Sequence, residues 1–351
     1  MQQNFHTLDE ILSQPDAWED VIQRVEKDRN KLNDVFRNEE YEEVLFLGCG
    51  SSYYLCLSAS RVFANFIGRK STALPSSELL LYPDIYLKRG KSYLIVPVSR
   101  SGETSETVNA LSYVRESYRI KSFAISCYEE SSLLKESDAC LILPRASEKS
   151  VVMTKSFTSM LLALELAIAL SAEANDYYRE LQTLPKLGEN IIKRYKSFLE
   201  DFVKDLGCEQ FVYLGSGPYY GLACEAMLKM KEMANLPCEA YHTLEYIHGP
   251  KSTANDKTLV CLLYSADERK WEERFLEELA SLGTRNLIEC EVSMDRIRKL
   301  SDLVVEIKSE LSDFARGILY MPPLQLLAFY KAVKRNLNPD RPKNLSQVVT
   351  Y

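Results

Sequence analysis

An internal repeat is the feature that most constrains how this 351-residue chain can fold. The apolar run at residues 44–50 ends in Gly-Cys-Gly, and its counterpart at 211–217 ends in Gly-Ser-Gly. Three more apolar runs, at 93–99, 122–126 and 137–143, recur in the same order at 259–265, 286–290 and 301–307. The offset between partners stays between 164 and 167 residues. A constant offset of this kind indicates a duplicated structural unit.

Within each copy, the apolar runs alternate with amphipathic segments such as 104–118 and 272–282. Strands that are apolar throughout are buried on both faces, as in parallel sheets covered by helices. The sequence therefore predicts an α/β fold with two doubly wound parallel-sheet subdomains of the flavodoxin-like sandwich type. The segment 156–205 has a helical pattern and joins the copies, with a break expected at Pro185 and Gly188.

Chain length and the repeat together predict five parts. Two domains of about 150 residues each would suit a chain of this size. We expect an N-terminal helical segment 1–36, a first subdomain 37–175, a helical linker 176–206, a second subdomain 207–335, and a tail 336–351 that closes over the site.

Composition excludes several classes of function. The net charge of −7 comes without a basic block, which argues against a nucleic-acid partner. Residues 1–14 lack the pattern of a signal peptide, and no apolar run is long enough for a membrane span, so we expect a cytoplasmic protein without a membrane partner. The nine cysteines are scattered and only three histidines occur, which predicts reduced thiols and no catalytic metal site.

Two turns of the first copy, 48–52 and 99–104, are rich in small hydroxyl residues. Ligands of open α/β sheets bind beyond the carboxyl ends of the strands, where these turns lie. The hydroxyls of 99–104 flank Gly102, which would let a phosphate approach closely. A turn with an ordinary helix N-cap would use the same residues. The equivalent turn of the second copy, 265–269, has acidic residues instead, and this asymmetry favours an anion site in the first copy only.

A second cluster lies in the helical segment 222–233. Glu225, Lys229 and Glu232 share one helical face because they are four and three residues apart. A solvated salt bridge is the alternative interpretation, but most of this helix is apolar, which indicates burial. Buried carboxylates beside a lysine are candidates for a functional site. Farther along, His248 precedes a Gly-Pro pair that would hold its imidazole on a rigid loop.

Together these segments resemble the SIS (sugar isomerase) superfamily over nearly the whole chain. The double-SIS group within it contains the isomerase half of glucosamine-6-phosphate synthase, sugar isomerases of amino-sugar catabolism, ketosamine-phosphate deglycases and one class of glucosamine-6-phosphate deaminases. The segments that carry the resemblance are 49–52, 99–104, 154–158, 225–232, 247–250 and 342–345.

The resemblance implies a role for each candidate residue. Glu232 would shuttle a proton between C1 and C2 of the sugar, with Lys229 as its charge partner and Glu225 in the same polar cluster. His248 is similar to the histidine that opens the pyranose ring and that reaches across a dimer interface in the synthase, so a homodimer is expected. The residues implied in phosphate binding are Ser51, Ser52, Ser99, Arg100, Ser101, Thr104, Val151 and Thr154.

Two departures from the family pattern narrow the expected chemistry. Gln347 stands where the family tail often has a lysine, which excludes a Schiff base at that position. The sequence has no glutaminase region and no cysteine at position 2, so we expect no glutamine-dependent amination. Isomerisation through an enediol or enolamine needs ring opening, one base and one donor to the oxygen, and therefore neither a metal nor another cofactor.

Three hypotheses for function follow. The leading one is an aldose–ketose isomerase or isomerising deaminase acting on glucosamine 6-phosphate or galactosamine 6-phosphate. The second is a deglycase that releases an amine from a fructosamine 6-phosphate. The third is a non-catalytic phosphosugar sensor, against which the presence of Glu232, Lys229 and His248 argues.

Overall fold

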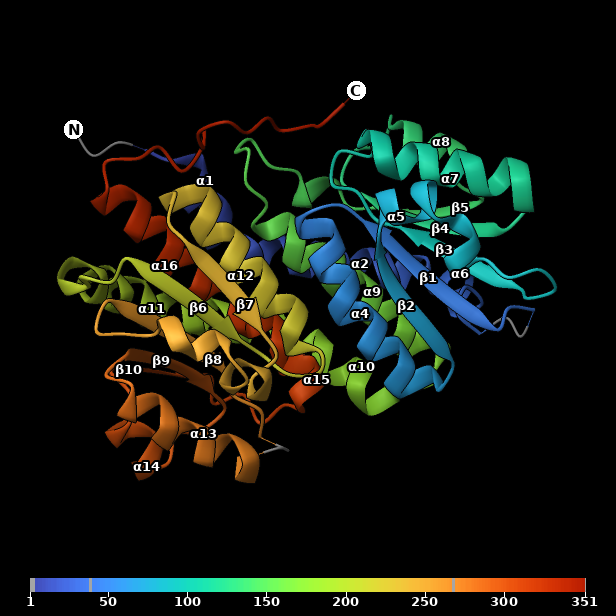
Figure 1. Ribbon diagram of the computed structural model, residues 1–351. Helices are drawn as coiled ribbons and strands as arrows, with labels where there is room; N and C mark the ends of the chain where they lie inside the picture. Colours follow the sequence, from blue (N-terminus) through green and yellow to red (C-terminus); the bar gives the residue numbers. More distant parts are fainter. Residues whose placement is uncertain (1–3, 38–39, 267–268, 351) are drawn as a thin grey trace. The chain divides into compact units, whose positions relative to one another are not determined.

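The computed structural model describes residues 4–37, 40–266 and 269–350, and the chain forms two compact units (Figure 1). The first unit comprises Ser13–Pro185 and the tail from Ser346 onwards. The second comprises the N-terminal segment up to Leu12 and Lys186–Leu345. Each end of the chain thus belongs to the unit that is built mainly from the opposite half of the sequence.

The first unit contains a five-stranded sheet in the order β2-β1-β3-β4-β5, with every neighbouring pair parallel. This is the order of a flavodoxin-like doubly wound sheet. The strands are β1 (Glu43–Gly48), β2 (Lys70–Pro75), β3 (Tyr93–Pro97), β4 (Lys121–Ser126) and β5 (Ala139–Ile142).

Helices cover both faces of this sheet, as the apolar strands require (Figure 1). On one face α4 packs against α9, and α2 packs on the outside of α9. On the other face α5, α7 and α8 follow one another. The helices are α2 (Gln14–Lys27), α3 (Arg29–Asn33), α4 (Ser51–Ile67), α5 (Ser76–Leu81), α6 (Pro83–Tyr86), α7 (Ser105–Tyr118), α8 (Ser132–Glu136), η1 (Pro144–Ala146), α9 (Lys155–Ser171) and α10 (Asn175–Gln182).

The second unit repeats this topology. Its sheet order is β7-β6-β8-β9-β10, again with all neighbours parallel, so the two sheets have the same strand order. The predicted fold class and the predicted duplication are therefore confirmed. The strands are β6 (Gln210–Leu214), β7 (Cys238–Tyr241), β8 (Thr258–Leu263), β9 (Arg285–Cys290) and β10 (Leu303–Glu306).

In the second unit α12 and α16 pack together on one face of the sheet, while α13 and α14 lie on the other (Figure 1). Helix α1 packs on α16. The elements are α1 (His6–Leu12), α11 (Leu184–Asp205), α12 (Tyr219–Ala234), η2 (Leu244–Ile247), η3 (Pro250–Thr253), α13 (Arg269–Ser281), α14 (Asp295–Lys299), α15 (Asp313–Arg316), η4 (Gly317–Tyr320) and α16 (Met321–Lys334).

The predicted break in the connecting helical segment is right in one place and wrong in another. Helix α10 ends at Gln182 and α11 begins at Leu184, so the chain does break just before Pro185. Proline fits the first turn of a helix because the N–H that it lacks would have no partner there. Gly188, however, lies inside α11 and interrupts nothing.

The helices of the described residues include none that is both long and apolar enough to cross a membrane. All nine cysteines are unbridged. Within the same described ranges, no group of three or more His, Cys, Asp and Glu side chains could hold a metal ion.

Glu289 on β9 is an ionisable residue inside the core of the second unit. Its side chain is fully buried, and among the described residues neither carboxylate oxygen has a hydrogen-bond partner. Burial raises the pKa of Glu289 well above its ordinary value, since a carboxylate without partners is poorly stabilised away from water. The core therefore favours the neutral acid.

Replacing Glu289 by Gln should flatten the pH dependence of stability. The unfolded chain releases the Glu289 proton above a pH of about 4.5, whereas the folded chain retains it, so the parent loses stability as pH rises. The loss should approach about 1.4 kcal/mol per pH unit until the folded pKa is reached. Urea unfolding of both proteins from pH 5 to 8 measures this difference. Parallel pH profiles would contradict the prediction, and Glu209→Gln, at an exposed position, is the matched control.

Candidate functional site

The turn between β3 and α7 gathers the hydroxyls that the sequence predicted for an anion site. Ser99 Oγ accepts the Gly102 N–H at 3.0 Å and lies 3.0 Å from Thr104 Oγ1. Ser101 Oγ accepts the Glu103 N–H at 3.1 Å. A hydroxyl that accepts one hydrogen bond keeps its own hydrogen for donation. The turn can therefore offer several O–H donors at the carboxyl end of β3.

Gly102 is required by the shape of this turn. Its φ of +67° lies in the left-handed region, and a Cβ at this position would come within 2.2 Å of Ser131 Oγ. The close packing of α8 against the turn leaves no room for a side chain there.

The second predicted turn, between β1 and α4, places Ser51 and Ser52 in the first turn of α4, where both are largely buried. The N–H of Ser52 bonds to the carbonyl of Cys49 at 3.1 Å. Gly50, just before the helix, has a φ of +55°, and Gly217 at the equivalent place in the second unit has a φ of +56°. The duplication thus extends to the backbone of the loops.

Arg100 and Thr154 form internal contacts centred on Glu148, which sequence reasoning did not identify. Arg100 Nη1 donates to the Val151 carbonyl at 2.9 Å and lies 3.5 Å from Glu148 Oε2. Glu148 Oε1 accepts the Thr154 N–H at 2.6 Å and its hydroxyl at 2.8 Å. Glu148 also accepts the N–H and the hydroxyl of Ser156. Three predicted phosphate contacts therefore lie together: Arg100, Val151 and Thr154. The side chains of Arg100 and Thr154 are bound to the Glu148 carboxylate.

The C-terminal tail lies on the same region of the first unit. Gln347 Nε2 donates to the Glu148 carbonyl at 2.9 Å, and the Gln347 carbonyl accepts from Arg100 Nη2 at 2.7 Å. The Ser105 N–H bonds to the Val349 carbonyl at 3.4 Å. A cavity of about 640 Å³ lies here, and its lining includes Arg100, Ser101 and Gln347.

In the second unit, Glu225, Lys229 and Glu232 lie together on α12, as their spacing predicts. Lys229 Nζ is 3.3 Å from Glu225 Oε1 and 2.5 Å from Glu232 Oε2. The Lys229 and Glu225 side chains are fully buried, whereas that of Glu232 is 17% exposed. Burial alone would lower the pKa of Lys229, but the attraction of Glu225 and Glu232 outweighs it and raises this pKa. Lys229 is thus a stable cation, and Glu232 is the carboxylate that a small molecule can reach.

His248 lies between two short 3-10 turns, at the end of η2 and just before η3. Its N–H bonds to the Glu245 carbonyl at 3.1 Å, and Gly249 follows with a φ of +127°. His248 is therefore exposed on a loop of two short 3-10 turns. Another histidine, His242, stacks on Tyr220 with 3.8 Å between the ring centroids.

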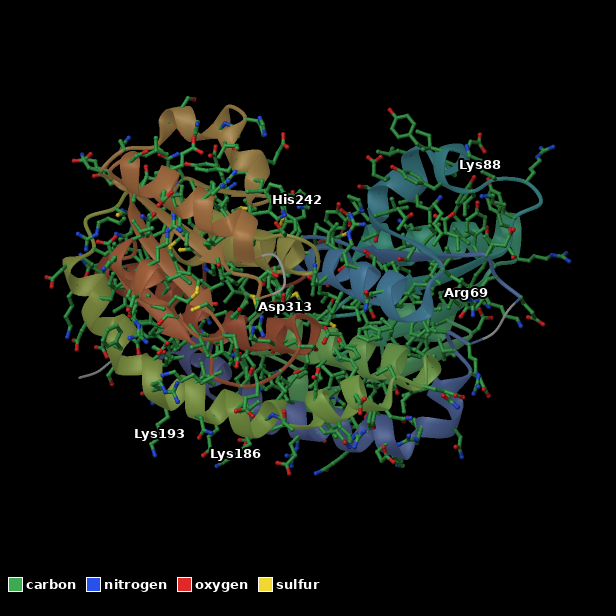
Figure 2. All side chains as sticks on the ribbon, turned by 90° about the horizontal axis from the view of Figure 1, so that it is seen from below. Arg69, Lys88, Lys186, Lys193, His242 and Asp313 are labelled. Carbon is green, nitrogen blue, oxygen red and sulfur yellow. The ribbon has the colours of Figure 1, made fainter. Side chains whose placement is uncertain are left out.

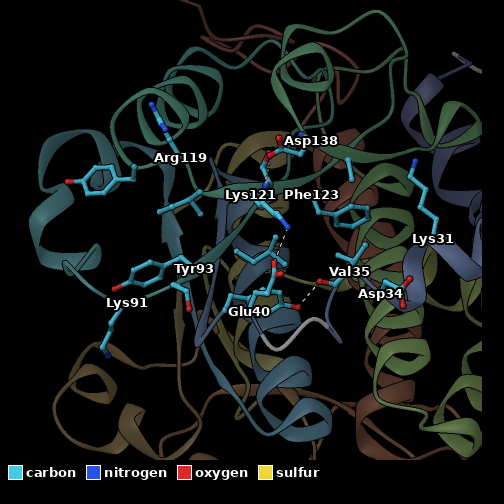
Figure 3. A pocket seen from close by; sticks show the side chains of 17 residues that line it. Lys31, Asp34, Val35, Glu40, Lys91, Tyr93, Arg119, Lys121, Phe123 and Asp138 are labelled. Carbon is cyan, nitrogen blue, oxygen red and sulfur yellow. Dashed lines mark hydrogen bonds and ion pairs between the residues drawn. The ribbon is translucent and has the colours of Figure 1, made fainter.

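A cavity of about 450 Å³ lies at the other end of the strands of the first sheet (Figure 3). It lies at the amino ends of β3, β4 and β5, where Lys121 pairs with Glu40 at 3.0 Å and Asp138 accepts from Ser122. Ligands of open α/β sheets bind beyond the carboxyl ends of the strands, so this cavity is not the substrate site that the fold predicts.

Comparison with known protein families identifies the family of this chain. The SIS domain model matches the chain twice, at residues 39–170 and 207–335. The chain belongs to the SIS-domain family. The two matches fall on the two sheets, so each parallel sheet with its helices is one SIS copy.

Relatives of this SIS protein act on sugar phosphates according to their names. Over 318 residues it is 31% identical to glutamine–fructose-6-phosphate aminotransferase (isomerizing) of Pyrobaculum aerophilum, covering 88% of this chain and 51% of that protein. The chain thus spans about half the length of the curated relatives that it matches.

Two solved structures match nearly the whole fold. Glucosamine-6-phosphate deaminase from Thermotoga maritima superposes with a TM-score of 0.80 at 29% identity, covering 99% of this chain and 100% of that one. Tagatose-6-phosphate ketose/aldose isomerase from Escherichia coli superposes with a TM-score of 0.88 at 23% identity, covering 97% and 96%, which supports the fold alone.

Proposed function

We propose that this SIS protein is a phosphosugar isomerase or isomerising deaminase that acts on glucosamine 6-phosphate or galactosamine 6-phosphate. The observation that carries the proposal is the geometry on α12, where a buried ammonium is bound by two carboxylates and only Glu232 remains partly accessible. A carboxylate held next to a fixed cation, at the edge of a buried cluster, suits repeated uptake and release of a proton. The similarity to a deaminase over the full length of both chains adds support.

The substrate phosphate is assigned to the hydroxyl-rich turns of the first SIS copy. Ser52, Ser99, Ser101 and Thr104 are the proposed donors, and the backbone of the loop 151–154 would close over the anion. Binding a phosphate far from the reacting carbons supplies energy that can hold the open-chain sugar in place. Arg100 acts in this proposal through its bonds to Val151 and Gln347, which hold the loop and the tail.

In this proposal, His248 and Glu232 each carry out one kind of proton transfer. His248 assists ring opening, which produces the free aldehyde at C1. Glu232 then removes the C2 proton, and Lys229 and neighbouring donors offset the negative charge that develops on the sugar oxygen. Return of the proton to C1 yields an imine at C2, and addition of water to this imine releases ammonia and leaves the ketose 6-phosphate.

A homodimer forms part of the proposal. His248 is exposed on a loop of the second unit, so its imidazole is available at the surface of the protomer. In such a dimer His248 of one protomer would serve the sugar bound to its partner.

Ammonia release from an amino-sugar phosphate is the test. Purified protein given glucosamine 6-phosphate or its galacto epimer should release ammonia and form ketose 6-phosphate in equal amounts. Both products are assayed separately, with and without a metal chelator, since no step above needs a metal. Fructoselysine 6-phosphate and a plain aldose 6-phosphate are run beside them.

The other outcomes favour the competing functions. Lysine release from fructoselysine 6-phosphate, without ammonia from either amino sugar, would favour the deglycase. Ketose formed only from the plain aldose would favour a simple isomerase. Tight phosphosugar binding without turnover of any substrate would favour a sensor.

A further inference from the structure

The turn of the second SIS copy that corresponds to the predicted phosphate site is already filled by an anion from the protein itself. Ser265 follows β8 as Ser99 follows β3. Ser265 Oγ donates to Asp313 Oδ2 at 2.5 Å, and the Ala266 N–H donates to Asp313 Oδ1 at 3.1 Å. Both carboxylate oxygens are therefore bound by the turn. Asp267 and Glu268, the acids that the sequence placed here, lie outside the described residues.

Arg316 completes the surroundings of this carboxylate. Its guanidinium forms an ion pair with Asp313 and is 1% exposed. Tyr219 and Tyr320 hold the guanidinium in place, with Arg316 Nη2 at 3.3 Å from the Tyr219 hydroxyl and Arg316 Nε at 3.1 Å from the Tyr320 hydroxyl. Asp313 itself opens the short helix α15 (Figure 2). A hydroxyl, a backbone N–H and a buried guanidinium are the donors with which proteins bind phosphate.

The first copy differs at this point, although it also has a buried carboxylate nearby. Glu148 is bound by Arg100, Thr154 and Ser156. Within the described ranges no carboxylate contacts the Ser99 hydroxyl, which bonds to the Gly102 N–H and to Thr104. Arg100 stands where the second copy has Ala266, and the Arg100 guanidinium binds the acid of the first copy.

We propose that Asp313 is a built-in substitute for a phosphate. The second SIS copy retains a phosphate-type nest made by Ser265, the Ala266 N–H and Arg316, and the Asp313 carboxylate occupies it. Asp313 thereby restricts phosphate binding to one turn per chain and prevents a phosphosugar from binding in the wrong copy. Removing the carboxylate should open a site for inorganic phosphate or a phosphate monoester. The occupied nest concerns the second unit alone, whereas the restriction of phosphate to one turn per chain rests on the proposed phosphate site of the first unit.

Asp313→Ala tests the proposal, with inorganic phosphate as the probe. Titration calorimetry should show one more phosphate bound per chain than in the parent, and the Tm of the variant should rise with phosphate by several degrees more than that of the parent. The same comparison in a Ser101→Ala background weakens binding at the predicted site of the first unit, so the contribution of the new site stands out more clearly. Sodium chloride at equal ionic strength controls for general salt effects.

Two further variants make the result specific. Asp313→Asn keeps the shape and one acceptor oxygen in the nest, so it should show no gain in phosphate binding. Asp313→Ala combined with Ser265→Ala removes a donor and should bind phosphate about tenfold more weakly than Asp313→Ala alone.

Loss of the buried ion pair could also prevent Asp313→Ala from folding. Refolding is then followed with and without phosphate, and recovery that requires phosphate would support the proposal. It is overturned if Asp313→Ala responds to phosphate no more than the parent, or if phosphate does not restore an unfolded variant. Ammonia production by the parent is measured independently, so failure here leaves the proposed function standing.

Discussion

Glu232→Gln is expected to slow the exchange of solvent deuterium into a bound amino-sugar phosphate by about 10²- to 10⁴-fold. The amide has the size of the carboxylate but cannot take up the C2 proton. Phosphosugar affinity should change little, because the proposed phosphate donors lie in the other SIS copy. The exchange rate is followed by NMR in deuterated water, and affinity is measured by calorimetry.

Glu239→Gln is the matched control for this variant, since Glu239 is exposed on β7 and has no proposed role. A Glu232→Gln protein that exchanges at the parent rate would refute the assignment of the base. Glu245, exposed beside the His248 loop, would then be the next residue to test.

Ser101→Ala is expected to weaken phosphosugar binding by about 10- to 100-fold, the effect of losing one hydrogen bond to a charged group. The turnover of bound substrate should fall much less, since the phosphate is remote from the carbons that react. A titration at several substrate concentrations separates these two effects as changes in KM and kcat.

Ser137→Ala supplies the comparison in the same unit, because the Ser137 hydroxyl, just after α8, donates to the Leu133 carbonyl and has no proposed role. Ser265→Ala, in the second copy, should likewise leave affinity unchanged, although it removes the bond to Asp313. Equal losses of affinity in the Ser101 and Ser265 variants would contradict a phosphate site confined to the first copy.

The inner strands of both sheets could be predicted from the sequence because most of their residues are apolar and nearly all are buried. Two edge strands, β2 and β7, were not identified as strands. Most residues of β2 and β7 are only partly buried or exposed, so these strands lack the continuous apolar run. The break predicted at Gly188 was wrong for a different reason. A long amphipathic helix that packs well tolerates one glycine in its interior.

The candidate site could be predicted where its residues are local in sequence. The spacing on α12 and the hydroxyls of 99–104 each lie within one segment, so periodicity and composition were sufficient to find them. Glu148, Asp313 and Arg316 were missed because isolated charged residues usually indicate solvent exposure. The contacts that bury them include distant partners, Arg100 for Glu148 and Ser265 for Asp313. A buried carboxylate near the end of each copy would be recognised only by aligning the two halves after the fifth strand.

Each chain end belongs to the unit that is built mainly from the opposite half of the sequence. This arrangement affects how the protein folds during synthesis and how it can be divided into halves. Because residues 346–350 contact the turn and loop of the first unit, that unit gains its last stabilising bonds only after the whole second copy has been synthesised. Conversely, α1 is synthesised long before α16, the helix against which it packs. A gene cut at Pro185 would deprive each half of a terminal segment that packs against it, so we expect the separated halves to be less stable than the same units in the intact chain.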